Sequence, residues 1–220
     1  MNNKSILLAI SVLLLTGCTN TPQISPTPGS TVTPEIFVER NYPPPTPPST
    51  IPELIDVLLG DYGDEARIGA AYALGQMGEK ATPAIPALTI NLFHEGPYEV
   101  RLQAAKALGE IGPNAQSSVP MLIAVMFKDF VHVRAEAAEA LGKIGDTTAI
   151  PALALALDDE ENEVSIYAAK SIAILANQNF PDVGATGFTL DEDGVPLIVK
   201  AANVWWKQEG QFQDWASQSK

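Results

Sequence analysis

The chain has 220 residues, a single cysteine and a net charge of −13, from 13 basic and 26 acidic side chains. A nucleic-acid-binding protein needs a basic surface that displaces counterions from phosphates, and this sequence has no basic run, so we expect no nucleic-acid partner. One cysteine excludes an internal disulfide, so a folded domain must be stabilised by packing alone.

The first 17 residues have the pattern of an export signal. The run Ile6–Leu15 has ten residues and is apolar except for one serine. This is about half of what a bilayer-spanning helix needs, so the run predicts a cleaved signal peptide over residues 1–17. The residues that follow, Leu15-Thr16-Gly17-Cys18, resemble the lipobox of bacterial lipoproteins. The resemblance implies cleavage before Cys18 and acylation of Cys18, with palmitate among the attached chains.

The lipobox also implies a location. A lipidated Cys18 anchors the mature chain to a membrane of the bacterial cell envelope, and another envelope protein is then the expected partner. Many Gram-negative lipoproteins that stay in the inner membrane have aspartate directly after the cysteine, whereas this chain has Thr19. For a host with two membranes, the resemblance therefore favours the outer one.

Residues 18–50 are predicted to be a tether. Nine of the 18 prolines lie between residues 19 and 50, where they fix the backbone and remove amide donors. Two alternatives to a spacer remain open. The proline run, which includes Pro43-Pro44-Pro45, could be a ligand for an aromatic groove. The more apolar patch Glu35-Ile36-Phe37-Val38 could dock onto the first repeat.

Residues 51–180 repeat one pattern four times. A phrase of 13 residues reads ARIGAAYALGQMG at Ala66–Gly78, VRLQAAKALGEIG at Val100–Gly112, VRAEAAEALGKIG at Val133–Gly145 and VSIYAAKSIAILA at Val164–Ala176. Its second position recurs at intervals of 34, 33 and 31 residues. A period of this length predicts a stacked array of helical hairpins that provides an extended surface.

Each repeat is predicted to contain two helices. The first helix opens with proline in second place, at Ile51-Pro52, Ile85-Pro86, Val119-Pro120 and Ile150-Pro151. Thr50, or a residue near it, can cap the first of these helices. The 13-residue phrase is the second helix, with apolar residues at i, i+4, i+8 and i+11 on one face. Its mid-helix glycine predicts close approach of a neighbouring helix, and its final glycine predicts a left-handed helix end.

The fourth repeat and the residues after it depart from this pattern. Ala173 and Ala176 replace the two glycines, so we expect the last second helix to continue past Ala176. Residues 181–220 are predicted to cap the array through a helix that ends near Gln208 and carries Trp205 and Trp206. Phe212 and Trp215 are expected to complete this cover.

The phrase V-R-x-x-A-A-x-A-L-G-x-I-G, with I-P-x-L before it, resembles short HEAT repeats and, more closely, the HEAT-like repeats first described in phycobilisome bilin lyases. The resemblance implies an all-α fold, an α-α superhelix of about four hairpins plus a C-terminal capping helix. Some proteins of this kind attach or remove bilins, and many others are scaffolds or adaptors. Those lyases act in the cytoplasm, whereas residues 1–18 direct export.

We therefore interpret the protein as a non-enzymatic scaffold or adaptor for another envelope protein. The alternatives are a lyase-type factor that binds a bilin or another bulky ligand, and a structural envelope protein whose proline segment is the active part. In such folds the second helices line the concave face. Their outward positions form the predicted partner-binding face, which comprises Tyr72, Gln76, Gln103, Lys106, Glu110, Glu136, Glu139, Lys143, Tyr167 and Lys170.

The sequence predicts no catalytic residue, cofactor or metal site. His94 and His132 precede second helices but lack further ligands at metal-binding spacing. The stretch Asp191-Glu192-Asp193-Gly194 begins like a calcium loop, yet Lys200 stands where that loop needs glutamate.

The repeated arginines Arg67, Arg101 and Arg134 have a structural interpretation. Repetition at one point in every unit predicts a ladder of polar contacts between repeats. A phosphate-binding row is the alternative. The acids expected near these arginines are Asp61 and Asp64, Glu99, and Asp129.

Overall fold

The computed structural model describes residues 49–180, 190–192 and 195–218. The predicted signal peptide, Cys18, almost all of the tether and parts of the predicted cap lie outside the described residues. Apart from a single bridge between Leu190 and Pro196, these segments contain only helices and their connections. Among the residues that the structure describes, no helix is both long and apolar enough to cross a membrane.

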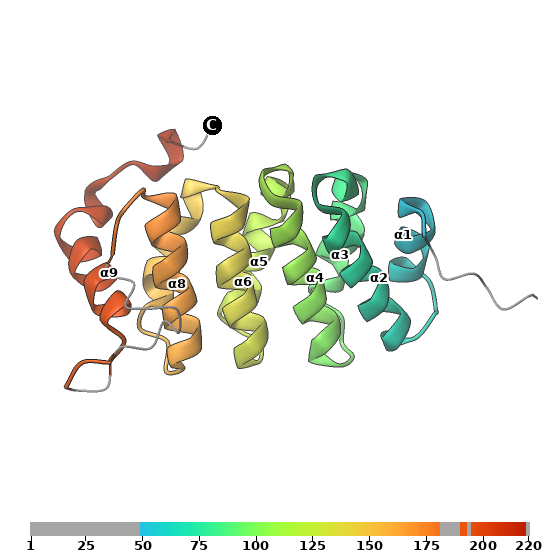
Figure 1. Ribbon diagram of the computed structural model, residues 1–220, viewed down its shortest axis with the longest axis horizontal. Helices are drawn as coiled ribbons and strands as arrows, with labels where there is room; N and C mark the ends of the chain where they lie inside the picture. The colour runs from blue at the N-terminus through green and yellow to red at the C-terminus, as the bar shows by residue number, and fades with distance from the viewer. Residues whose placement is uncertain (1–48, 181–189, 193–194, 219–220) are drawn as a thin grey trace, which may run out of the picture. The chain divides into compact units, whose positions relative to one another are not determined.

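The described residues from Ile51 to Leu175 form four helical hairpins that stack side by side in two layers (Figure 1). The first helices are α1 (Ile51–Leu59), α3 (Ile85–Asn91), α5 (Val119–Met126) and α7 (Ile150–Ala156). The second helices are α2 (Asp64–Met77), α4 (Tyr98–Ile111), α6 (Val131–Ile144) and α8 (Asn162–Leu175). The predicted all-α superhelix of the HEAT/armadillo type is confirmed.

The first helices begin where proline predicts. Each has proline in its first turn, where the missing N–H has no helical acceptor to lose. Thr50 caps α1 in a capping box: its hydroxyl accepts from the Glu53 amide, and the Glu53 carboxylate accepts from the Thr50 amide at 3.0 Å. The apolar stripe of this helix, Leu54 and Leu58, is buried.

The second helices pack against one another along their lengths, through small residues. An added Cβ on Gly75 would lie 3.2 Å from the Cα of Ala107, and one on Gly109 would lie 3.0 Å from the Cα of Ala140. Successive first helices touch one another much less. The mid-helix glycines therefore let the second-helix layer pack closely, as predicted.

The connections between repeats contain elements that the sequence analysis missed. Two short 3₁₀ helices, η1 (Gly78–Ala84) and η2 (Gly112–Ser118), join the hairpins, and η3 (Thr147–Ala149) follows α6. The final glycines of the first three phrases all have positive φ, from 54° at Gly78 to 83° at Gly145. Only Gly145 is in the left-handed helical region; the other two have strongly negative ψ, a conformation that essentially only glycine adopts.

The predicted extension of the fourth second helix is wrong. Helix α8 ends at Leu175, and Asn177 has φ of +50°. Asparagine tolerates this left-handed conformation better than most non-glycine residues, so the chain leaves the helix one residue after the position at which the other repeats have glycine.

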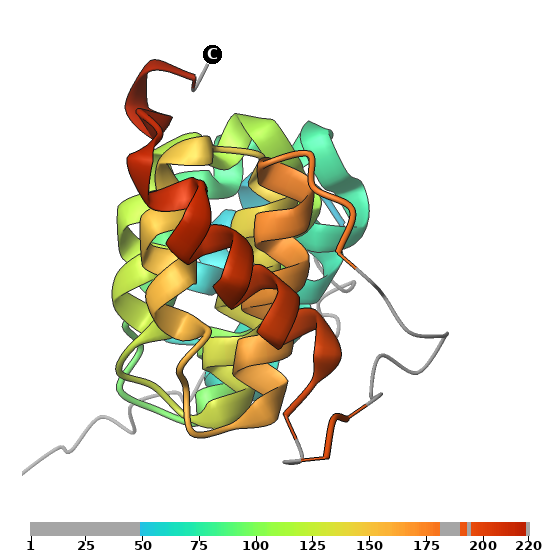
Figure 2. The same ribbon diagram turned by 90° about the vertical axis from the view of Figure 1, so that its left-hand side faces the viewer.

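The end of the array is covered by α9 (Leu197–Gln208), which crosses the last hairpin diagonally (Figure 2). Trp205 is 7% exposed, and its ring lies 5.9 Å from those of Phe180 and Trp215. Trp215 lies in η5 (Trp215–Ser217), after η4 (Gly210–Phe212), and its carbonyl accepts a hydrogen bond from Thr147. The prediction for Phe212 is wrong, because this ring is 77% exposed.

Candidate interaction surface

The ten predicted partner-binding residues all lie on the second helices, but their exposure differs. We call this set the second-helix face. Five are exposed, namely Tyr72, Gln76, Lys106, Glu110 and Lys143. The other five are half-buried, namely Gln103, Glu136, Glu139, Tyr167 and Lys170. The face therefore combines five exposed side chains with five half-buried polar ones.

Lys143 connects two repeats within this face. Its ammonium lies 2.9 Å from the carboxylate of Glu110 on α4 and 2.9 Å from that of Glu139 on α6. Partial burial opposes the charged form, but these two acidic partners outweigh it and raise the pKa of Lys143. The face thus has a fixed charge pattern in its middle.

Burial also perturbs the neighbouring acid and phenol. Burial and the adjacent Glu139 raise the pKa of Glu136. The same two causes, burial first, raise the pKa of Tyr167, whose ring contacts Lys170 at 5.7 Å from the ring centroid. These shifts result from burial and from neighbouring charges in the second-helix layer.

The second-helix face has a shallow hollow between α2 and α4. Tyr72, Gln76, Gln103, Lys106 and Glu110 line it together with small backbone-proximal residues, and it encloses about 10 Å³. Pockets for drug-sized ligands have volumes of several hundred Å³. The hollow is therefore a contact for one or two side chains.

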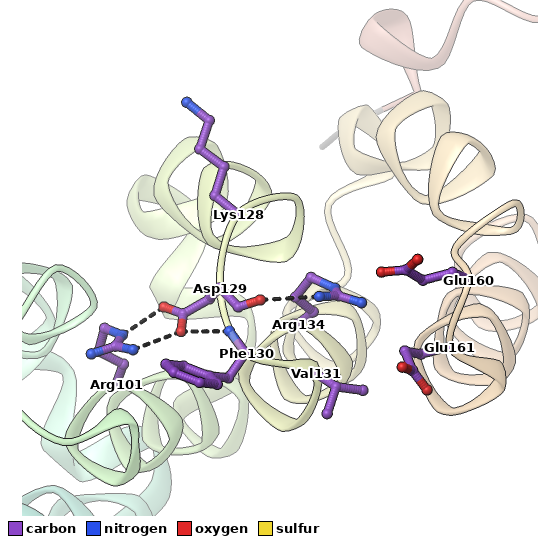
Figure 3. Close-up of a pocket in the computed structure, with 8 residues that line it drawn as sticks. All are labelled: Arg101, Lys128, Asp129, Phe130, Val131, Arg134, Glu160 and Glu161. Atoms are coloured by element: carbon purple, nitrogen blue, oxygen red, sulfur yellow. Dashed lines mark hydrogen bonds and ion pairs between the residues drawn. The ribbon is translucent and has the colours of Figure 1, made fainter.

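The arginine ladder is present between the later repeats. Arg101 on α4 donates to both carboxylate oxygens of Asp129, at 2.6 and 2.7 Å (Figure 3). Arg134 on α6 donates to both carboxylate oxygens of Asp159, at 3.2 and 2.8 Å. Each aspartate lies in the loop of the following repeat. The hydrogen bond to Asp129 raises the pKa of Arg101 despite its burial. Because both guanidiniums are already paired, the structure favours a ladder over a phosphate-binding row.

The predicted partners of the ladder are only partly right. The Asp129 carboxylate pairs with Arg101, whereas Arg134 donates to the Asp129 backbone carbonyl at 3.1 Å, and Glu99 is not hydrogen-bonded to either arginine. Arg67 donates to the Gly60 carbonyl at 2.6 Å instead of to Asp61 or Asp64. The sequence could not show that each loop reaches back to the preceding repeat.

The histidines have structural contacts. Nδ1 of His94 accepts from the Gly96 amide at 2.9 Å, and the ring lies 3.5 Å from the Asp64 carboxylate. His132 lies in the first turn of α6, mostly exposed, 3.2 Å from Glu163. Within the residues that the structure describes, no three His, Cys, Asp or Glu side chains gather as metal ligands. Part of the stretch that begins like a calcium loop, residues 193–194, lies outside those residues.

Comparison with known families agrees with this repeat geometry. Residues 85–173 match the family model of HEAT repeats, and residues 66–94 match that of the PBS lyase HEAT-like repeat. The chain contains HEAT repeats. A search of curated proteins found no match.

Solved structures with a similar fold are also helical repeat proteins. The complex of CpcE and CpcF of phycocyanin lyase from Nostoc sp. PCC7120 is 27% identical, covers 78% of this chain and 70% of its own, and superposes with a TM-score of 0.55. A designed armadillo repeat protein is 19% identical over 70% of this chain and 79% of its own, with a TM-score of 0.52. An engineered protein, 21% identical over the same shares, has a TM-score of 0.53.

Proposed function

We propose that this HEAT-repeat protein is a non-enzymatic adaptor, anchored to a membrane of the bacterial cell envelope through lipid on Cys18, that binds another envelope protein. The second-helix face is its binding surface. One observation carries the proposal: the ten residues of this face include three lysines and three glutamates, so the face is neutral on a chain with a net charge of −13. A patterned polar surface with exposed aromatics suits recognition of a specific protein.

The binding face can be tested by charge reversal at Lys106. This side chain is exposed and has no ion pair with the described residues, so Lys106→Glu changes the surface without removing a structural contact. We expect cross-linking in the native envelope to recover at least about tenfold less partner with Lys106→Glu. Lys80→Glu, an exposed residue of η1 away from this face, is the matched control. Equal recovery with both variants would refute the assignment of the face.

The anchor can be tested separately. Cys18→Ala removes the only cysteine, and we expect this variant to leave the membrane fraction when envelopes are washed with salt. Mass spectrometry of the parent chain should show acylated Cys18 at the new amino terminus. An unmodified Cys18, with equal membrane retention of the parent and the variant, would exclude lipid anchoring. The protein-binding face is judged separately, by the Lys106→Glu experiment.

A second candidate function is a lyase-type factor that binds a bilin. It is favoured by the match of residues 66–94 to the PBS lyase HEAT-like repeat and by the likeness to the phycocyanin lyase complex. On the second-helix face, however, the hollow between α2 and α4 encloses only about 10 Å³, which is too small for a bilin. Titration with a linear tetrapyrrole decides: saturable binding with a red-shifted absorbance band would favour this candidate, and no spectral change would remove it.

A further inference from the structure

A different surface, formed by the loops between the first and second helices, carries a row of exposed apolar side chains. We call this the loop edge and define it as residues 59–63, 92–97, 127–130 and 157–161. Its exposed large apolar residues are Leu59, Tyr62, Phe93, Phe127 and Phe130, with exposed fractions from 44% at Phe127 to 62% at Phe130.

The row follows the repeat. Leu59, Phe93 and Phe127 are 34 residues apart and occupy the same place in three successive repeats. Stacked helices are about 8–10 Å apart, so these side chains form a line with that spacing. Single exposed apolar residues are normal, but a contiguous row of them marks an interaction surface.

The row ends at an acidic loop. In the fourth repeat, Asp158 stands where the earlier repeats have Leu59, Phe93 and Phe127, and Glu160 and Glu161 follow it. Within the described residues, neither glutamate side chain has an ion-pair partner.

A pocket of about 510 Å³ joins the apolar and acidic parts of the loop edge (Figure 3). Arg101 and Arg134, which line this pocket, are each neutralised by an ion pair, with Asp129 and with Asp159 respectively. Lys128 extends away from the other labelled side chains (Figure 3). Apart from the paired arginines and Asp129, the charged residues that line the pocket are therefore Glu160, Glu161 and Lys128, which together leave one negative charge beside the exposed ring of Phe130.

We propose that the loop edge binds an extended segment of a partner protein, with apolar side chains lying along the row and a lysine or arginine entering the pocket. Three residues of an extended segment in the polyproline II conformation make one turn and advance about 9 Å, so every third side chain lies on the same side and can meet the next position of the row. The cation is attracted by the two glutamates, whose negative charge exceeds the single positive charge of Lys128. A second copy of this chain is a poor occupant, because both copies are strongly acidic.

The probe is a fluorescein-labelled peptide, Leu-Ser-Gly-Leu-Ser-Gly-Arg-Arg, titrated against the full-length chain by fluorescence anisotropy. We expect saturable binding that weakens at least about tenfold when the two arginines become glutamates, or when the two leucines become serines. Equal binding of all three peptides would overturn the proposal.

Two double variants locate the peptide. Phe93→Ser with Phe127→Ser, and Glu160→Lys with Glu161→Lys, should each weaken binding at least about tenfold. The controls, Val204→Ser on α9 and Glu79→Lys in η1, replace residues that are also exposed and should bind as the parent does. Circular-dichroism melting verifies that each variant is folded, and unchanged affinity in folded loop-edge variants would refute the site.

The same variants distinguish a protein segment from a lipid surface. Flotation with phosphatidylcholine vesicles should show no dependence on Phe93 and Phe127. Vesicle binding that these substitutions abolish, without peptide binding, would mean a membrane contact and would overturn the proposal. Lys106→Glu should leave peptide binding unchanged, so this test is independent of the second-helix face.

Discussion

Two glycines in the interiors of second helices should respond oppositely to replacement by alanine. A Cβ on Gly69, in α2, would have no heavy atom within 4 Å, apart from its own helix backbone and chain neighbours. A Cβ on Gly142, in α6, would lie 2.5 Å from Oγ, 2.8 Å from Cβ and 3.0 Å from Cα of Ser171 on α8. Neither glycine has a positive φ, so the backbone accepts alanine at both positions.

The magnitudes follow from these surroundings. Alanine is favoured over glycine inside a helix by about 1 kcal/mol, so Gly69→Ala should raise the free energy of unfolding by about 0.5–1 kcal/mol. Gly142→Ala has the same helix gain, but overpacking costs about 1–3 kcal/mol. It also displaces Ser171, whose hydroxyl donates to the Ala138 carbonyl at 2.7 Å, and losing this bond costs about 1 kcal/mol. We expect Gly142→Ala to lower the free energy of unfolding by about 1–3 kcal/mol.

Urea unfolding followed by far-ultraviolet circular dichroism measures both changes on the full-length chain. Ser171→Gly removes most of the obstructing side chain, so it should recover part of the stability that Gly142→Ala loses, and a double-mutant cycle gives the coupling. The reasoning would be refuted by a Gly142→Ala variant as stable as Gly69→Ala.

Three further predictions concern single contacts. Asp129→Ala leaves Arg101 buried without its carboxylate and should lower the free energy of unfolding by about 3 kcal/mol in urea; a change below about 0.5 kcal/mol would mean that the pair is dispensable. Thr50→Ala removes the hydroxyl that caps α1 and should cost about 1 kcal/mol by the same assay, whereas Thr50→Ser should cost much less. The folded state raises the pKa of Glu136 and so favours its protonated form. Glu136→Gln should therefore stabilise the fold at neutral pH, with no gain in stability below the pKa of an unfolded glutamate. A stability gain that is the same in melts at pH 3 and pH 7 would contradict this.

The repeat architecture could be predicted from the sequence because each determinant is local. Proline in the first turn, the apolar stripe and the mid-helix glycine each act within one helix or between adjacent helices, and they recur in register. The close approach at Gly75 and Gly109 follows from this recurrence. The end of α8 could not be predicted in this way, because the chain leaves this helix at an asparagine with positive φ, Asn177, instead of at a glycine.

The polar contacts were less predictable because they join residues from different repeats. Asp129 and Asp159 pair with arginines 28 and 25 residues earlier, and the sequence does not show which loop turns toward which helix. The loop-edge row was missed for a related reason. Leu59, Phe93 and Phe127 recur with the period of the array, and a periodic apolar residue resembles a core position until its exposure is known.

The packing of the second helices and the proposed recognition on their outer side are linked. The glycine contacts set how closely neighbouring second helices approach, and this distance fixes the spacing of Tyr72, Lys106, Glu139 and Lys170 across the face. Lys143 then joins α4 to α6 at their surface. A substitution that separates α6 from α8 without unfolding the array should therefore weaken partner binding although it touches no exposed residue. Gly142→Ala is that substitution, and its partner recovery in cross-linking, compared with that of Gly69→Ala, tests whether helix spacing sets the recognition surface.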